Sequence, residues 1–257
     1  MTDPPYGLHE YQPREVAKLR NGRGGVWRLP PSFDGAQRMP LPRFTVNTST
    51  DRAELRVFFK EWAELLMPVL RPGGHVFIAS NSLMSPIVAT AMESAGFERR
   101  GEIVRLVRTL RGGDRPKGAH EEFSEVSTMP RSCWEPWGLY RRPLSESTVA
   151  ANLRRWGVGG LRRLSEQTPF LDVIESGKTP ARERELASHP TAKPQAFLRQ
   201  LIRASLPADD GVVLDPFAGC ATTLAAAEAV GVSGIGTEID PQYWELACDA
   251  IPPLSRL

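Results

Sequence analysis

Asp215-Pro216-Phe217-Ala218-Gly219-Cys220-Ala221-Thr222-Thr223 is the stretch of sequence that decides the fold. It follows an apolar run at 211–215, which predicts a short buried strand, and it leads into an alanine-rich helix at 222–230. Open α/β sheets bind ligands at the carboxyl ends of their strands, beside glycine-bearing turns of this kind. Small residues let the backbone approach a ligand, and the helix start offers free N–H groups. The stretch therefore predicts a ligand site.

Glu238 follows this turn at the end of the next predicted strand, residues 234–238. A carboxylate in that position commonly accepts hydrogen bonds from a ribose. The turn matches neither GxGxxG nor GxxxxGK[ST], which disfavours a dinucleotide and a P-loop triphosphate. A plain strand–turn–helix, in which Thr222 or Thr223 only caps the helix, remains the simpler interpretation.

The rest of the chain alternates predicted helices with predicted strands. The helices are expected at 52–69, 86–95, 194–206 and 243–250, and the strands at 75–79 and 102–110. This alternation predicts an α/β fold with a mostly parallel sheet. Residues 7–50 show almost no hydrophobic periodicity, and a connection of that length is usually functional or disordered.

Composition narrows the class of protein. The 257 residues, 41% of them hydrophobic, suit one large domain or one domain with a small insert. A net charge of +2 excludes a polybasic protein, so a positive surface for nucleic acid must be local. The three cysteines form no CxxC pair and support neither a disulfide framework nor a zinc site. Because no apolar run reaches ~18 residues and no leader is recognisable, we expect a soluble, cytoplasmic protein.

Positive charge is concentrated in residues 141–164, which carry six arginines and one acidic residue, Glu146. Two arginine pairs in this stretch could grip phosphates or read guanine edges. They are Arg154 with Arg155, and Arg162 with Arg163. A solvated basic helix face is the alternative interpretation.

Asp3-Pro4-Pro5-Tyr6 is the most informative tetrapeptide of the chain. Proline fixes φ and holds the preceding residue extended, so the Asp3 carboxylate and the carbonyl that follows keep a fixed relation. An extruded base with an exocyclic amine needs two acceptors for the amine and an aromatic ring to stack on. A proline-rich tail without a role is the competing interpretation.

Together, the tetrapeptide at 3–6 and the turn at 215–223 resemble the amino-directed DNA methyltransferases. The order of the motifs resembles their permuted β class, in which the catalytic motif precedes the cofactor motif. The segments 189–194 and 129–143 resemble further parts of that family. The resemblance implies a Rossmann-like, S-adenosylmethionine-dependent methyltransferase sheet with helices on both faces. It divides the chain into a catalytic half (1–143), a target-recognition insert (144–187) and a cofactor-binding half (188–257).

By this resemblance the cofactor is S-adenosylmethionine, the partner is double-stranded DNA, and no metal takes part. Asp3 and the Pro4 carbonyl, on the rigid step to Pro5, would hold the target amine, and Tyr6 would stack on the flipped base. The expected cofactor-binding residues are Asp215, Phe217, Gly219, Thr222, Glu238, Lys193 and Pro194. The expected DNA-binding residues are Arg154, Arg155, Arg162 and Arg163. Methyl transfer would be direct, and no Pro-Cys dipeptide offers a cysteine nucleophile.

Two features depart from the family pattern. Ala221 stands where the family usually has a second glycine, and its methyl group could crowd the cofactor or shift the turn. Only two residues precede Asp3, whereas relatives carry a strand and a helix before the tetrapeptide. We therefore expect an N-terminally truncated chain, either a late-called start or a decayed copy.

Adenine N6 is the favoured target, because the Asp-led tetrapeptide leans that way, and cytosine N4 is the alternative. An inactive remnant that only binds DNA also stays open. Methylation of RNA or of a protein amide is disfavoured, since related enzymes there carry an Asn-led tetrapeptide. A homodimer and a paired restriction enzyme are left open. We expect Trp134 and Trp137 in the core, while Trp27 and Arg28 could close over DNA.

Overall fold

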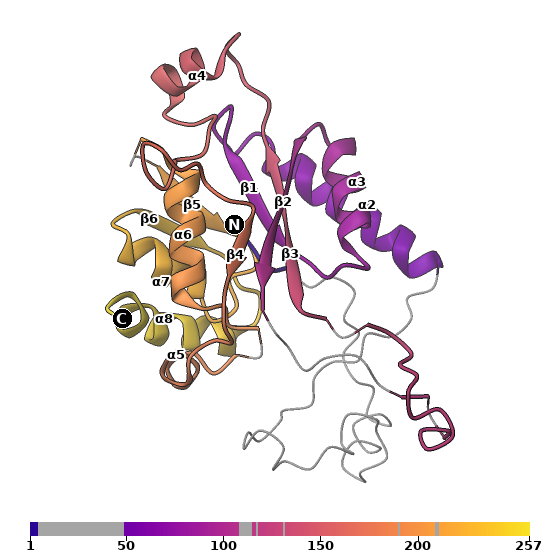
Figure 1. The fold of residues 1–257 in the computed structure, drawn as a ribbon. Coiled ribbons are helices and arrows are strands. Elements are labelled where there is room, and N and C mark those ends of the chain that lie inside the picture. The colour runs from indigo at the N-terminus through magenta and orange to yellow at the C-terminus, as the bar shows by residue number, and fades with distance from the viewer. Residues whose placement is uncertain (5–48, 108–114, 117, 131, 190, 209–210) are drawn as a thin grey trace.

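The computed structural model describes residues 1–4, 49–107, 115–116, 118–130, 132–189, 191–208 and 211–257 (Figure 1). Its strands are β1 (His75–Ala79), β2 (Glu98–Leu106), β3 (Trp134–Arg141), β4 (Val173–Glu175), β5 (Val212–Asp215) and β6 (Ser233–Gly236). Its helices are α2 (Ser49–Leu66), α3 (Ser85–Ser94), α4 (Val149–Trp156), α5 (Ala181–Leu186), α6 (Gln195–Ser205), α7 (Thr222–Ala229) and α8 (Pro241–Ser255).

The strands form a four-stranded sheet in the order β1-β3-β2-β4 and a separate pair, β5-β6. β4 is parallel to β2 and β6 is parallel to β5, but β3 is antiparallel to both of its neighbours. The expectation of a mostly parallel sheet is therefore wrong for the larger sheet. β3 follows β2 along the chain and pairs with it directly, and an antiparallel pair needs no crossover helix.

Residues 1 and 2 lie between the two sheets (Figure 1). Thr2 forms a parallel bridge with Ile78 of β1: its N–H donates to Phe77 O, and its carbonyl accepts from Ala79 N, both at 2.9 Å. On the other side, the Met1 nitrogen donates to Leu214 O of β5 at 2.8 Å. Two residues of main chain thus connect β1 to β5 and point the following residues toward the carboxyl ends of both strands.

Helices cover both faces of the sheet, as the resemblance implies. Alternate residues of β1 show the two layers: Phe77 and Ala79 pack with α6, while Val76 and Ile78 pack with α2 and α3. This is the period-two pattern of a strand buried on both faces.

Trp137 is 1% exposed and belongs to the core under α6, which confirms its expected place. Trp134 is 38% exposed, so the expectation of a core position is wrong for this residue. It is the first residue of β3, where the strand has only begun to enter the sheet.

Candidate active site

The candidate site lies where residues 1–4 emerge beside the carboxyl ends of β1 and β5. The hydroxyl of Thr2 donates to Asp215 Oδ1 at 2.7 Å, and both residues are buried. The N–H of Phe217 donates to the same oxygen at 3.2 Å. Because Asp3 follows Thr2 directly, it lies next to a residue that is hydrogen-bonded to the predicted cofactor turn. The two motifs, over 200 residues apart in sequence, are brought together.

The turn after β5 is built on two residues in the left-handed region, Gly219 (φ 53°) and Ala221 (φ 57°). Ala221 is the one residue other than glycine with positive φ in the described part of the chain. A non-glycine residue in this region costs about 1–3 kcal/mol, which accounts for the glycine that the family pattern favours there.

Ala221 is also the residue that precedes the first turn of α7, and its side chain offers no cap. Thr222 is the first helical residue, so the interpretation of Thr222 as the helix cap is wrong. The Thr222 carbonyl accepts a hydrogen bond from Gln195 Nε2 at 2.8 Å, and the residue is buried.

Glu238 fastens this turn to the end of β6. Its Oε2 accepts from Gly219 N at 2.7 Å, and its Oε1 accepts from Asp240 N at 2.9 Å. Because a carboxylate has about four lone-pair sites, each oxygen can still accept from a ligand hydroxyl. Glu238, Gly219 and Asp215 thus form one continuous rim along β5 and β6.

Aromatic rings close the rim on two sides. The Phe217 ring lies 6.2 Å from that of Phe58 and 5.9 Å from that of Trp62, both on α2. The His189 ring packs edge to face on Tyr243 at 4.4 Å. A Cβ added to Gly219 would lie 3.3 Å from the His189 ring, so a larger residue would need that ring to move.

Lys193 connects two acidic residues of the site. Its Nζ donates to Asp3 Oδ2 at 2.6 Å and lies 3.5 Å from Glu135 Oε2. Arg105 Nη1 approaches the same Glu135 oxygen at 3.4 Å, and Trp137 Nε1 donates to Glu135 Oε1 at 2.6 Å. The side chains of Asp3 and Lys193 are 14% and 9% exposed. Together these residues form a buried charged network behind Asp3.

Burial and neighbouring charges shift the proton affinities in this network. Burial raises the pKa of Asp3 above its ordinary value, and Lys193 opposes that rise. Burial would also raise the pKa of Glu135, but Lys193 and Arg105 outweigh it and hold that pKa low. Although burial lowers the pKa of Lys193, the two carboxylates outweigh it and raise that pKa overall. Lys193 is therefore a stable cation between two acids.

Pro194 is buried immediately before α6, and the N–H groups of Phe197 and Leu198 both approach its carbonyl. Lys193 thus projects from the point at which α6 begins. The resemblance makes Lys193 a cofactor-binding residue, whereas its ammonium group here contacts Asp3 and Glu135.

The structure does not bring Arg154 and Arg155 to this site. They lie in the last turn of α4, and Asn152 of that helix donates to Pro72 O, just before β1. β1 extends about 13 Å from His75 to its carboxyl end, where Asp3 lies. Arg155 pairs with Glu146 at 2.6 Å, and both arginines are exposed.

Arg162 and Arg163 are held by main-chain carbonyls outside any helix. Arg162 Nη2 donates to Pro207 O at 2.8 Å, beyond the end of α6, and Arg163 Nη2 donates to Gln167 O at 3.0 Å. A helix of eleven residues spans about 16 Å, so Arg162 lies at the opposite end of α6 from Lys193. The helix-face alternative does not apply to these two arginines.

Several expected residues lie outside the described residues: Pro5, Tyr6, Trp27 and Arg28. Two others were not predicted from the sequence, Glu135 and Arg105. Neither stands out in the sequence, because β2 carries several other charged residues and β3 contains Pro136 and Gly138.

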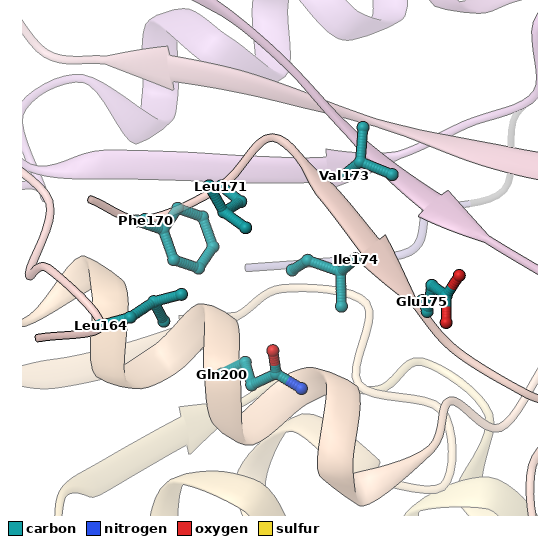
Figure 2. A pocket seen from close by; sticks show the side chains of 7 residues that line it. All are labelled: Leu164, Phe170, Leu171, Val173, Ile174, Glu175 and Gln200. Carbon is teal, nitrogen blue, oxygen red and sulfur yellow. The ribbon is translucent and has the colours of Figure 1, made fainter. Parts of the chain in front are cut away.

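A shallow pocket lies elsewhere, between β4 and α6, and contains none of the residues above (Figure 2). Its lining residues are Leu164, Phe170, Leu171, Val173, Ile174, Glu175 and Gln200. Within the described ranges, no group of three or more potential metal ligands occurs. The helices described there are also too short or too polar to cross a membrane.

Comparison with known sequences gives one family. Residues 1–249 match the N6_N4_Mtase model, described as DNA methylase. The type II methyltransferase M2.DpnII of Streptococcus pneumoniae is 24% identical over 246 residues, which cover 96% of this chain and 79% of that protein. The DNA adenine methyltransferase YhdJ of Escherichia coli K12 is 51% identical over 59 residues, 23% of this chain and 20% of that protein.

Comparison with solved structures gives the same fold. The complex of M1.HpyAVI with SAM has a TM-score of 0.57 at 18% identity and covers 80% of this chain and 85% of that one. The cytosine-N4-specific PvuII DNA methyltransferase has a TM-score of 0.56 at 14% identity, covering 86% and 82%. The expected methyltransferase-like α/β fold is confirmed.

Proposed function

Because the chain belongs to the N6/N4 family of DNA methylases, we propose that it methylates the N6 amino group of adenine in double-stranded DNA. The methyl donor is S-adenosylmethionine. The observation that carries the proposal is the hydrogen bond from Thr2 to Asp215, which sets the Asp3 carboxylate beside the predicted cofactor turn.

The rim along β5 and β6 fits that cofactor. Asp215 and Glu238 offer carboxylate oxygens to an ammonium group and to ribose hydroxyls, and Gly219 leaves room where a Cβ would meet His189. The aromatic ring of Phe217 supplies an apolar wall next to α2. When bound, S-adenosylmethionine would supply a methyl group activated on a sulfonium; Thr222 and Pro194 complete its proposed surroundings.

The residues after Thr2 orient the target amine. Asp3 accepts one N–H of the amine and the Pro4 carbonyl accepts the other, which directs the nitrogen lone pair toward the methyl carbon. Pro5 keeps the two acceptors in register, and Tyr6 stacks on the extruded base. These residues would hold the amine for direct attack on the methyl group that S-adenosylmethionine would supply from its sulfonium, and one amine proton would then be released to solvent. No covalent intermediate with the protein is required.

Adenine is proposed over cytosine because of the Asp-led tetrapeptide and the adenine specificity in the name of YhdJ. Cytosine N4 methylation is the competing reaction, since the same two acceptors suit either amine. An inactive chain that still binds DNA is the third outcome, and the strained Ala221 motivates it.

We further propose that residues 144–187 form the target-recognition insert between the catalytic half (1–143) and the cofactor-binding half (188–257). Within it, Arg154 and Arg155 are exposed on α4 and suit phosphate contacts. Arg162 and Arg163 complete the proposed contacts; whether two copies act together is tested by sedimentation with DNA present.

The deciding experiment is methyl transfer from labelled S-adenosylmethionine to unmethylated genomic DNA, followed by nucleoside analysis. We expect label in N6-methyladenine, lost in Asp3→Ala and retained in Asp249→Ala, an exposed carboxylate on α8. Label in N4-methylcytosine would support the competing reaction. Absence of both label and cofactor binding would support the inactive chain.

A further inference from the structure

The charged network behind Asp3 is more extensive than the binding of an amine requires. It runs from Asp3 through Lys193 to Glu135 and Arg105, and Arg105 also lies 5.4 Å from the centre of the Phe197 ring. These side chains come from the N-terminal residues, the start of α6, β3 and β2. Three of them are 14%, 9% and 6% exposed, and Glu135 is 20% exposed.

A purely structural role explains this arrangement poorly. Desolvating two charges costs free energy that their attraction recovers only in part, so apolar side chains of similar volume often stabilise a core better. The network also ends at the one carboxylate that the proposed function places against substrate. The network therefore acts on the carboxylate of Asp3.

The contacts at Asp3 differ between its two oxygens. Oδ2 accepts from Lys193 at 2.6 Å, whereas no residue in the described ranges donates to Oδ1. Glu135 stands on the far side of the Lys193 ammonium group and restrains it, and Arg105 in turn restrains Glu135. One oxygen of Asp3 is thus fixed and the other is left as an acceptor.

We propose that Lys193 is a positioning residue for methyl transfer: restrained by Glu135 and Arg105, it holds one Asp3 oxygen and leaves the other to accept the hydrogen bond of the target amine. This inference rests on the proposed function for the identity of the substrate. It assigns Lys193 to the catalytic carboxylate rather than to the cofactor.

The charges around Asp3 make the inference testable by sign. Lys193 favours the ionised carboxylate, whereas Glu135 and Asp215 disfavour it. Arg105 acts on Asp3 through Glu135, which it contacts directly. Removing the charge of Lys193 and removing that of Glu135 should therefore shift the titration of Asp3 in opposite directions.

The experiment measures Asp3 titration in the full chain by carboxyl carbon NMR, together with the pH profile of kcat/KM. In Lys193→Met, both the titration midpoint and the acid limb should move to higher pH, by about one to three units. In Glu135→Gln both should move to lower pH. Lys193→Arg should restore most of the wild-type profile. Lys60→Met, a partly exposed lysine on α2 with the same charge change, should leave it unmoved.

An Asp3 midpoint that Lys193→Met leaves unchanged, or that both variants move in one direction, would overturn the inference. If Lys193→Met fails to fold, Glu135→Gln tests the inference, and an Asp3 midpoint unchanged in Glu135→Gln would overturn it. The NMR readout needs no methyl transfer. A wild-type chain that transfers no methyl group thus defeats the proposed function, while the Asp3 midpoints still test Lys193.

Discussion

Substituting Thr2 by valine removes one hydroxyl group and keeps the shape of the side chain. That hydroxyl donates to Asp215 Oδ1 at 2.7 Å, and it ties the N-terminal residues to the cofactor turn. Thr2 is 1% exposed and Asp215 is 3% exposed, so water cannot replace the lost donor without a rearrangement. The variant therefore isolates one buried hydrogen bond to a carboxylate.

The expected loss follows from the contacts that remain. A hydrogen bond to a charged group contributes about 1.5–3 kcal/mol, and Asp215 Oδ1 keeps only its longer contact with Phe217 N, at 3.2 Å. We expect Thr2→Val to lower the free energy of unfolding by about 2 kcal/mol. For a domain of this size, that corresponds to a fall in Tm of about 4–8 °C.

Urea unfolding followed by circular dichroism, with a thermal scan beside it, measures both quantities. Thr2→Ser keeps the hydroxyl and loses one methyl group, so it should cost only about 1 kcal/mol. Thr90→Val removes an exposed hydroxyl that donates within α3 and should change stability by less than about 0.5 kcal/mol. If Thr2→Val matches the wild type, or Thr2→Ser is as damaging as Thr2→Val, the reasoning is refuted.

Three further predictions concern the turn, the half-buried His75 and the basic helix. Ala221→Val should lower the free energy of unfolding in urea by about 2 kcal/mol or more, because a β-branched residue is forced to φ 57° in a fully buried position. Ala221→Gly should fold normally. Equal free energies of unfolding for the two variants would contradict this reasoning. Burial, reinforced by Arg141, lowers the pKa of His75 to about 4. Because the unfolded chain binds this proton at higher pH than the folded chain, the free energy of unfolding should fall as pH drops from about 6.5 to 4. His75→Gln should remove this pH dependence from unfolding curves. The double variant Arg154→Ala/Arg155→Ala should weaken DNA binding and reduce the dependence of DNA affinity on salt, while methyl transfer at saturating DNA persists. If the salt dependence of DNA affinity is unchanged, α4 does not contact DNA.

Local sequence patterns predict the elements whose residues mark them clearly. The apolar run 75–79 and the turn after Asp215 are short and well marked, and the structure places β1, β5 and α7 there. In α2, Leu65 is 75% exposed although its neighbour Leu66 is buried, which helical spacing alone does not tell apart. Spacing gives the face of a helix, but which residues at its margin are covered depends on what packs against it.

Local patterns do not predict which distant segments pair with each other. β3 contains Glu135, Pro136 and Gly138, which obscure a strand until its two neighbours are known. The contact between Lys193 and Asp3 is likewise invisible in sequence, because nothing local marks a lysine before α6 as the partner of a carboxylate near residue 1. The site residues on the β5 turn could be predicted, whereas the network behind Asp3 could not.

The position of residues 1 and 2 between β1 and β5 has a consequence for the order of folding. Their partners in β1 lie more than 70 residues away along the chain, and the Met1 contact with Leu214 closes a span of 213 residues. Contacts of such high sequence separation pay a large loop-closure entropy and form after local ones. During synthesis, residues 1 and 2 are therefore made long before β5, and their final neighbours exist only once β5 has been made. We therefore expect Asp3 to acquire its surroundings late in folding, so that a partly folded chain has the residues of the site but not their geometry.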